Sequence, residues 1–144
     1  MLLAFVLTSM LALDPSADVA GLALAISDTV EQHPAPRRLA ALLVAIAWYE
    51  SRFRQDAVGD GGHSCGPYQS WVGPGILCER LRRDPMLATA RAIQQVHASL
   101  KACASEAVEN RLALYTSGSC DRGRKESRHR WWLAWKLLTE LTTR

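Results

Sequence analysis

The stretch "AIAWYESRFRQDAVGDGGHSCGPYQSW", residues 45–71, begins with a helical pattern and ends in a glycine-rich loop. Apolar residues recur at helical spacing before it, which predicts a helix from about Pro36 to about Phe53. Around the axis of that helix, Glu50 lies about 20° from both Leu39 and Leu43. The sequence therefore places a carboxylic acid within an apolar stripe.

An acid held against apolar neighbours has a raised pKa, because burial disfavours its charged form. A carboxyl group that is still protonated near neutral pH is what a general acid requires, for example to cleave a glycosidic bond. The alternative is a structural role, in which Glu50 lies at a helix end and reaches solvent or bonds a neighbouring arginine. Periodicity favours neither interpretation over the other.

The rest of the chain predicts an all-α protein with one domain. Residues 54–75 hold six glycines and two prolines, a composition typical of a long loop, and loops of this length are usually functional. Asp14-Pro15 and Asp84-Pro85 each predict the start of a helix. Shorter helical patterns follow over residues 108–115 and from about residue 121, and no alternating strand pattern is visible.

Two features near the C-terminus have a structural and a functional interpretation. Trp131, Trp132 and Trp135 form a stripe with two later leucines, which predicts core packing, with a membrane-surface helix as the alternative. The basic run "DRGRKESRHR", residues 121–130, predicts a solvated helix face. The formal net charge of +3 suits an anionic polymer such as cell wall or nucleic acid and identifies neither.

The N-terminal run "MLLAFVLTSMLAL" is short for a membrane span. Its length suits the apolar part of a signal peptide, although no Lys or Arg precedes it and no clear cleavage site follows. We expect residues 1–20 to be either a weak export signal or a hydrophobic N-terminal helix, and residues 21–144 to form the domain.

Four cysteines are present, and no two of them have C-x-x-C spacing. Two disulfides in an oxidising compartment are the first expectation, and free buried thiols are the alternative. The cysteines favour export to a periplasmic or extracellular location. The four residues are Cys65, Cys78, Cys103 and Cys120.

Three short motifs follow one another in the chain: Glu50-Ser51, then "GPYQ" at 66–69, then "ALYTSG" at 113–118. In this order they resemble the soluble lytic transglycosylase family of the lysozyme-like superfamily, which shows E-S, G-L-M-Q and A-Y-N-x-G. The resemblance covers roughly residues 36–135. It implies a lysozyme-like helical domain whose glycine-rich loop lines the active site.

The resemblance also implies roles for the positions that match. Glu50 would act as general acid and then as general base, and Ser51 would orient the substrate or Glu50. Gln69 would contact the sugar or the catalytic carboxyl, and Tyr115 would bond near Glu50 and line the cleft. Gly66 and Gly118 match the two glycines of the motifs.

Two further residues of these segments are candidates for binding sugar, and three positions depart from the motifs of the family. Tyr68 and Trp71 are candidates for stacking on sugar faces, with core burial as an equal alternative for each. Pro67-Tyr68 replaces the Leu-Met of the family, and Thr116 replaces its Asn, which removes an amide that could bind sugar.

The family cleaves the β-1,4 bond between N-acetylmuramic acid and N-acetylglucosamine with one carboxylate and leaves a 1,6-anhydro product. The implied partner is therefore the peptidoglycan glycan strand, without cofactor, metal, nucleic acid or stable membrane insertion. A lysozyme-type retaining hydrolase would need a second carboxylate about 5 Å away, for which Asp56 and Asp60 are the nearest candidates. Transglycosylation is favoured, and hydrolysis stays open.

Other chemistries compete for the same loop. "GHSCG" at 62–66 fits the serine nucleophile elbow but lacks the strand and helix that this motif needs. Cys65 could serve a cell-wall cysteine peptidase with a histidine base. A zinc site formed by His63, Cys65 and Cys78 lacks the usual ligand spacing. A non-catalytic glycan-binding module is a further alternative. The candidate bases are His63, His97 and His129.

The position of two cysteines suggests a disulfide pairing. Cys65 and Cys120 each lie beside a motif of the expected cleft, so a bond between them would hold its two walls together. We expect Cys78 and Cys103 to form the second bond.

Overall fold

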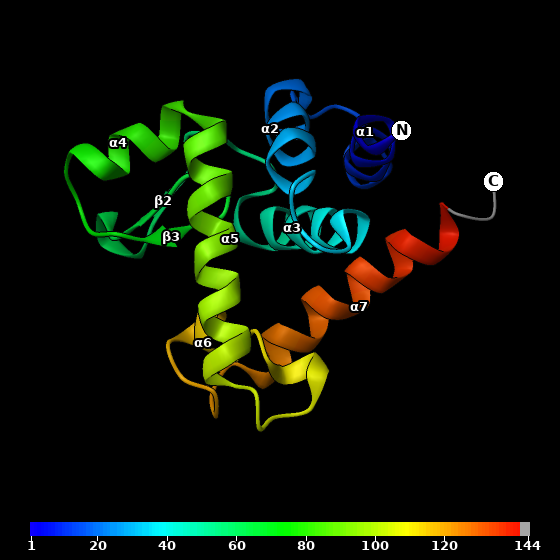
Figure 1. Ribbon diagram of the computed structural model, residues 1–144. Coiled ribbons are helices and arrows are strands. Elements are labelled where there is room, and N and C mark those ends of the chain that lie inside the picture. Colours follow the sequence, from blue (N-terminus) through cyan, green and yellow to red (C-terminus); the bar gives the residue numbers. More distant parts are fainter. Residues whose placement is uncertain (142–144) are drawn as a thin grey trace.

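The computed structural model describes residues 1–141. In that part of the chain seven α-helices and a small antiparallel sheet form one mostly helical domain (Figure 1). The elements are α1 (Leu2–Leu13), α2 (Ala20–Val30), α3 (Pro36–Ser51), β1 (Val58–Gly59), β2 (Ser64–Cys65), β3 (Ser70–Trp71), α4 (Ile76–Arg83), α5 (Pro85–Ala102), α6 (Ala113–Ser117) and α7 (Arg124–Glu140), with short 3-10 turns at Asp60–Gly62 and Val108–Asn110.

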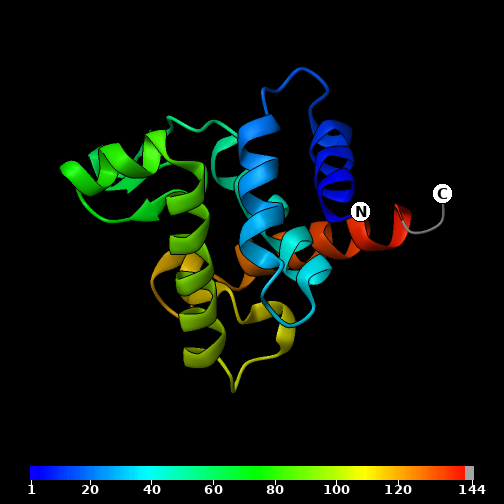
Figure 2. The same cartoon turned by 45° about the horizontal axis from the view of Figure 1, so that its top comes forward.

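Helix α3 runs through the middle of the domain and packs against α1, α2, α5 and α7 (Figures 1 and 2). It begins at Pro36, as predicted, and all eight residues from 40 to 47 are buried. A helix that is apolar on every side must be enclosed by other elements. The apolar surface of α3 is therefore wider than the single stripe that the sequence predicted.

The N-terminal apolar run forms helix α1, which contacts α2 and α3. Phe5, Val6 and Met10 of this helix belong to the buried core.

The predicted helix start at Asp14-Pro15 is wrong, since α2 begins at Ala20. Asp14 ends α1 instead, and its carboxylate accepts hydrogen bonds of 3.0 and 2.7 Å from the backbone and hydroxyl of Ser16. Within residues 1–141, no helix is both long and apolar enough to cross a membrane.

The glycine-rich segment contains the sheet that an all-α interpretation missed. Strand β2 pairs antiparallel with β1 on one side and β3 on the other. Each strand has only two residues, too few to produce a visible alternation of polar and apolar side chains. Helix α4 follows the sheet and was also missed, because only Cys78 and Leu81 of its eight residues are buried.

All four cysteines form disulfides, but the predicted pairing is wrong. Cys65 bonds Cys78, which ties β2 to α4, and Cys103 bonds Cys120, which closes the segment between α5 and α7. Both bonds join cysteines that are neighbours in sequence, 13 and 17 residues apart. Each disulfide therefore lies within one wall of the expected cleft, and neither of them connects the two walls.

Core packing was predicted for three tryptophans of α7, and the prediction is confirmed for one of them and wrong for the other two. Trp131 packs against the core, whereas Trp132 and Trp135 are 73% and 67% exposed. The buried side of α7 is formed by smaller or polar residues instead: Ser127, Arg130, Ala134 and Leu137.

The disulfide pairing predicts a simple tryptic map of the non-reduced protein. Cys65 and Cys78 lie in one tryptic peptide, residues 55–80, so their bond should appear as an internal disulfide of that peptide. Residues 102–111 should be recovered covalently joined to residues 112–122 through the second bond. Mass spectrometry before and after reduction measures both. Recovery of residues 55–80 joined to either other peptide would contradict the pairing.

Candidate functional site

A cleft of about 840 Å³ lies between the sheet and helices α5 and α6, with the end of α3 at its wall. It brings together five of the residues predicted for the site, together with Asp60, from segments distant in sequence. The predicted residues that line it are Glu50, Gln69, Trp71, Tyr115 and Gly118, and the others are Gly59, Asp60, Ser64, Gln95, Ala98, Leu114, Thr116 and Ser117.

Glu50 and Asp60 both line this cleft, and Glu50 is paired with Arg130. Arg130 Nη2 donates a 2.7 Å hydrogen bond to Glu50 Oε1, and the two side chains are 9% and 19% exposed, respectively. Burial raises the pKa of Glu50 above its usual value, although the Arg130 guanidinium acts in the opposite direction. The negative charge of Asp60 adds to the increase.

Arg130 is the main residue of the candidate site that the sequence did not predict. Its position in the basic run predicted a solvated side chain, but the guanidinium is buried between α7 and α3. Arg130 Nη1 also donates to the carbonyl of Glu126 at 2.8 Å, and the guanidinium lies 5.1 Å from the centre of the Tyr49 ring. The helical spacing of Arg130 with Ala134 and Leu137 was the available signal, since these residues share the core side of α7.

Tyr115 connects the α6 wall of the cleft to the glycine-rich segment. Its hydroxyl donates a 2.7 Å hydrogen bond to the carbonyl of Tyr68. Burial raises the pKa of Tyr115 well above its usual value, and the nearby charge of Glu50 raises it further. The Tyr115 hydroxyl therefore remains neutral at any physiological pH, and it donates its hydrogen bond to the glycine-rich wall.

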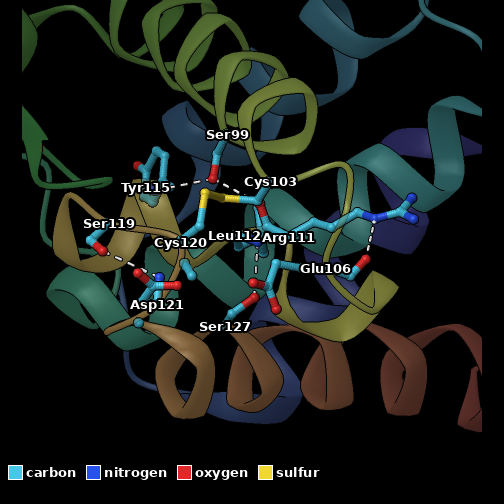
Figure 3. Close-up of a disulfide and its surroundings, with 12 residues drawn as sticks. Ser99, Cys103, Glu106, Arg111, Leu112, Tyr115, Ser119, Cys120, Asp121 and Ser127 are labelled. Atoms are coloured by element: carbon cyan, nitrogen blue, oxygen red, sulfur yellow. Dashed lines mark hydrogen bonds between the residues drawn. A yellow bond between two sulfur atoms is a disulfide. The ribbon is translucent and has the colours of Figure 1, made fainter.

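Two buried serines and a disulfide hold the segment that carries Tyr115 (Figure 3). Ser99 Oγ accepts from the backbone N–H of Tyr115 at 3.1 Å and donates to the carbonyl of Arg111 at 2.8 Å. Ser127 Oγ accepts from the backbone N–H of Leu112 at 2.9 Å. The Cys103–Cys120 bond closes the same segment, so the α6 wall is fixed from both α5 and α7.

Glycine is required at Gly66 in the opposite wall, and Gly59 leaves room there for the Gln69 side chain. Gly66 has a φ of +80°, and a Cβ there would lie 3.0 Å from the carbonyl oxygen of Leu81. A Cβ at Gly59 would collide with Oε1 of Gln69. Gln69 itself has a φ of +49°, and its Nε2 donates to the carbonyl of Gly66 at 3.0 Å. The backbone of this wall is therefore shaped to hold the Gln69 amide at the cleft.

Three residues predicted to bind substrate lie behind the cleft rather than in it. Ser51 is buried, and its hydroxyl donates to the carbonyl of Pro67 at 2.7 Å. Tyr68 is fully buried, with its hydroxyl 2.9 Å from that of Thr89. Gly66 is buried as well. In this structure these residues position the glycine-rich wall and offer no surface to a ligand in the cleft.

Trp71 and Asp60 occupy the accessible part of the cleft. The Trp71 ring is stacked on His63 with ring centres 4.9 Å apart and an angle of 15° between the planes, and Trp71 is 62% exposed. Asp60 accepts a short hydrogen bond from Ser64. Asp56, the other acid considered as a second carboxylate, is not among the residues that line the cleft.

The competing chemistries lack their necessary groups. Cys65 is bonded to Cys78 and offers no thiolate for a cysteine peptidase. Ser64, the serine of "GHSCG", is buried in β2 and bonded to Asp60, without the strand–turn–helix of a nucleophile elbow. Across residues 1–141, no three His, Cys, Asp or Glu side chains gather as metal ligands.

Comparison with protein-family models, with curated proteins and with solved structures found no match for this chain. The function must therefore be inferred from the cleft and its residues.

Replacing Arg130 by Gln should raise the pKa of Glu50 further. The substitution removes the positive charge that lowers this pKa and leaves the burial that raises it. A titration of the Glu50 carboxyl carbon by NMR measures the change. Arg128→Gln, an exposed neighbour on α7, is the matched control and should leave the pKa of Glu50 unchanged. An unchanged value in Arg130→Gln would contradict the role given to the ion pair.

Glu50 should also make the stability of the protein depend on pH. Because its pKa is higher in the folded than in the unfolded chain, its stabilising contribution is complete below the unfolded value and is lost as pH rises through the folded value. Urea unfolding of wild type and Glu50→Gln, at pH values on both sides of this window, measures the difference. The wild type should lose stability relative to the variant as pH rises; parallel curves would contradict the raised pKa.

Proposed function

We propose that this protein is a peptidoglycan-cleaving enzyme of the lytic transglycosylase type, with Glu50 as its only catalytic carboxyl group. The observation that carries the proposal is an acid with a raised pKa on the wall of an open cleft. The cleft also holds Gln69, Tyr115 and Gly118, which match the motifs of that family. The proposal includes the lysozyme-like fold that the same resemblance implies.

The proposed reaction needs a proton donor that later becomes a base. Glu50 would give its proton to the leaving glycosidic oxygen as the bond to the anomeric carbon breaks. The Glu50 carboxylate would then take the proton of the muramyl 6-hydroxyl while that oxygen bonds to the anomeric carbon. The product is a 1,6-anhydro sugar, and Glu50 regains its starting proton.

Arg130 fits this cycle as a positioning residue. It binds Oε1 of Glu50, and within residues 1–141 Oε2 accepts no hydrogen bond, so this oxygen can meet a ligand. The carboxylate that forms when Glu50 gives up its proton is stabilised by the adjacent guanidinium. Burial keeps the pKa of Glu50 raised despite that guanidinium, which favours its protonated form relative to an exposed carboxyl group.

The surroundings of Glu50 suit a glycan strand. The exposed Trp71 ring offers a flat apolar face for a sugar, and the Gln69 amide and the Thr116 and Ser117 hydroxyls supply polar groups along the cleft. Two disulfides are typical of proteins from oxidising compartments, which supports a periplasmic or extracellular location.

A retaining hydrolase acting on the same bond is the second candidate, and Asp60 is the observation in its favour. Asp60 lines the cleft with Glu50 and contributes to the raised pKa of Glu50. A second carboxylate close to the acid is what a retaining glycosidase uses as nucleophile. Asp60 is held by Ser64, however, and it has a φ of +50° at the start of a 3-10 turn, so a structural role explains it as well.

Glu50→Gln should abolish the release of muropeptides from purified sacculi. Loss of the general acid is expected to lower the rate by about a hundredfold or more. Glu79→Gln, which alters an exposed acid on α4, is the control and should retain activity. Mass spectrometry of the products should find anhydromuramyl ends. Sacculi cleared by Glu50→Gln at the wild-type rate would contradict the proposal, as would peptide-bond cleavage alone.

Asp60→Asn separates the two glycosidase mechanisms. A transglycosylase should keep its anhydro product in this variant, because Asp60 takes no part in the reaction. Reducing ends from the wild type, lost together with activity in Asp60→Asn, would instead identify a retaining hydrolase. Glycan binding without cleavage by the wild type would indicate a binding module.

A further inference from the structure

The outward face of α7 carries two exposed tryptophans. The buried residues Arg130, Ala134 and Leu137 define the core side of the helix. At about 100° per residue, Trp132 points almost directly away from that side, and Trp135 lies about 60° from Trp132. Both indole rings are largely exposed, at 73% and 67%. Large exposed apolar groups gathered on one face mark interaction surfaces more often than chance.

The same face is positively charged. Lys125, Arg128 and Lys136 are exposed and lie within about 40° of Trp132 around the helix axis. Of the two acids of α7, Glu126 lies about 120° from Trp132. Glu140 lies about 80° from it and pairs with Lys136 at 3.8 Å, which offsets part of the Lys136 charge and leaves Lys125 and Arg128 as the main cations of the face. We call the group Lys125, Arg128, Trp132, Trp135 and Lys136 the outer face of α7.

We propose that the outer face of α7 docks on the surface of an anionic lipid bilayer. Indole rings favour the boundary between headgroups and acyl chains, because they combine an apolar body with a polar N–H. Lys and Arg beside them are attracted to anionic headgroups. Helix α7 would lie in the plane of the interface, and the proposal involves no crossing of the membrane.

The shape of the face favours a flat surface over a chain-like ligand. Sugars, peptides and small molecules are usually held in concave sites. The outer face is the convex side of a helix, and no residue of α7 lines the Glu50 cleft or the smaller hollow beside α4. Excess positive charge also opposes close contact with the same face of a second copy, which would bring like charges together.

Docking in this way leaves the Glu50 cleft accessible. Arg130 lies about 160° from Trp132 around α7 and reaches inward to Glu50. The bilayer and the carboxyl group would therefore be on opposite sides of the helix. In Figures 1 and 2, α7 runs along one edge of the domain, with α3 on its inner side. The proposal is independent of the reaction at Glu50.

Co-sedimentation of the full chain with lipid vesicles tests the proposal. The wild type should bind vesicles of mixed phosphatidylglycerol and phosphatidylcholine and bind phosphatidylcholine alone much less. The double variant Trp132→Ala/Trp135→Ala should bind the anionic vesicles about tenfold more weakly or worse. Trp71→Ala, which removes a comparably exposed tryptophan from another face, is the matched control and should bind like the wild type.

The contribution of charge is tested in the same sedimentation assay, and folding of the variants is tested separately. Arg128→Gln/Lys136→Gln should weaken binding to anionic vesicles, and added salt should weaken binding of the wild type, since salt screens exposed charges. All substituted side chains are exposed, and circular dichroism verifies that each variant is folded. Equal binding of wild type and double tryptophan variant would overturn the proposal, as would no vesicle binding by the wild type. Self-association that depends on Trp132 and Trp135, in place of vesicle binding, would identify a second copy as the occupant.

Discussion

The ion pair between Glu50 and Arg130 is the constraint on which the rest of the site depends. It joins residues 80 positions apart and connects the end of α3 to the core side of α7. A buried carboxylate without a partner would be strongly destabilising, and so would a buried guanidinium. The two groups therefore require each other, and their contact fixes how closely α7 approaches α3. Glu50 lines the cleft, and Arg130 contacts it from behind the cleft wall.

The pKa of Glu50 depends on this pair and on burial, which act in opposite directions. Burial raises its pKa, Arg130 lowers it, and the increase prevails. Without the burial, Arg130 would hold the pKa of Glu50 below its usual value, and without Arg130 the ionised form of Glu50 would have no counter-ion. Tyr115, whose hydroxyl stays protonated and donates to the carbonyl of Tyr68, adds no charge near Glu50.

Local signals in the sequence were sufficient for part of the fold. Pro36 begins α3 as predicted, and Asp84 caps α5 by accepting from the backbone N–H of Leu87 at 3.0 Å. The position of Glu50 among apolar residues predicted its raised pKa. Arg130 was not singled out from the other cations of its run, because its helical spacing with Ala134 and Leu137 becomes decisive only when the side of α7 that meets α3 is known. Tyr68 was ambiguous for the same reason, since only the packed wall shows that it is fully buried.

The packing around Arg130 also explains why two tryptophans face outward. On the core side of α7, Ser127 and Ala134 lie about one turn on either side of Arg130, and both are buried. The facing surface of α3 is a close-packed, alanine-rich helix. A side chain long enough to reach Glu50 needs small neighbours on its own helix, since indole rings at those positions would hold α7 away from α3. Trp131 packs against the core one position away from Arg130, but Trp132 and Trp135 are excluded from this contact and lie on the outer face.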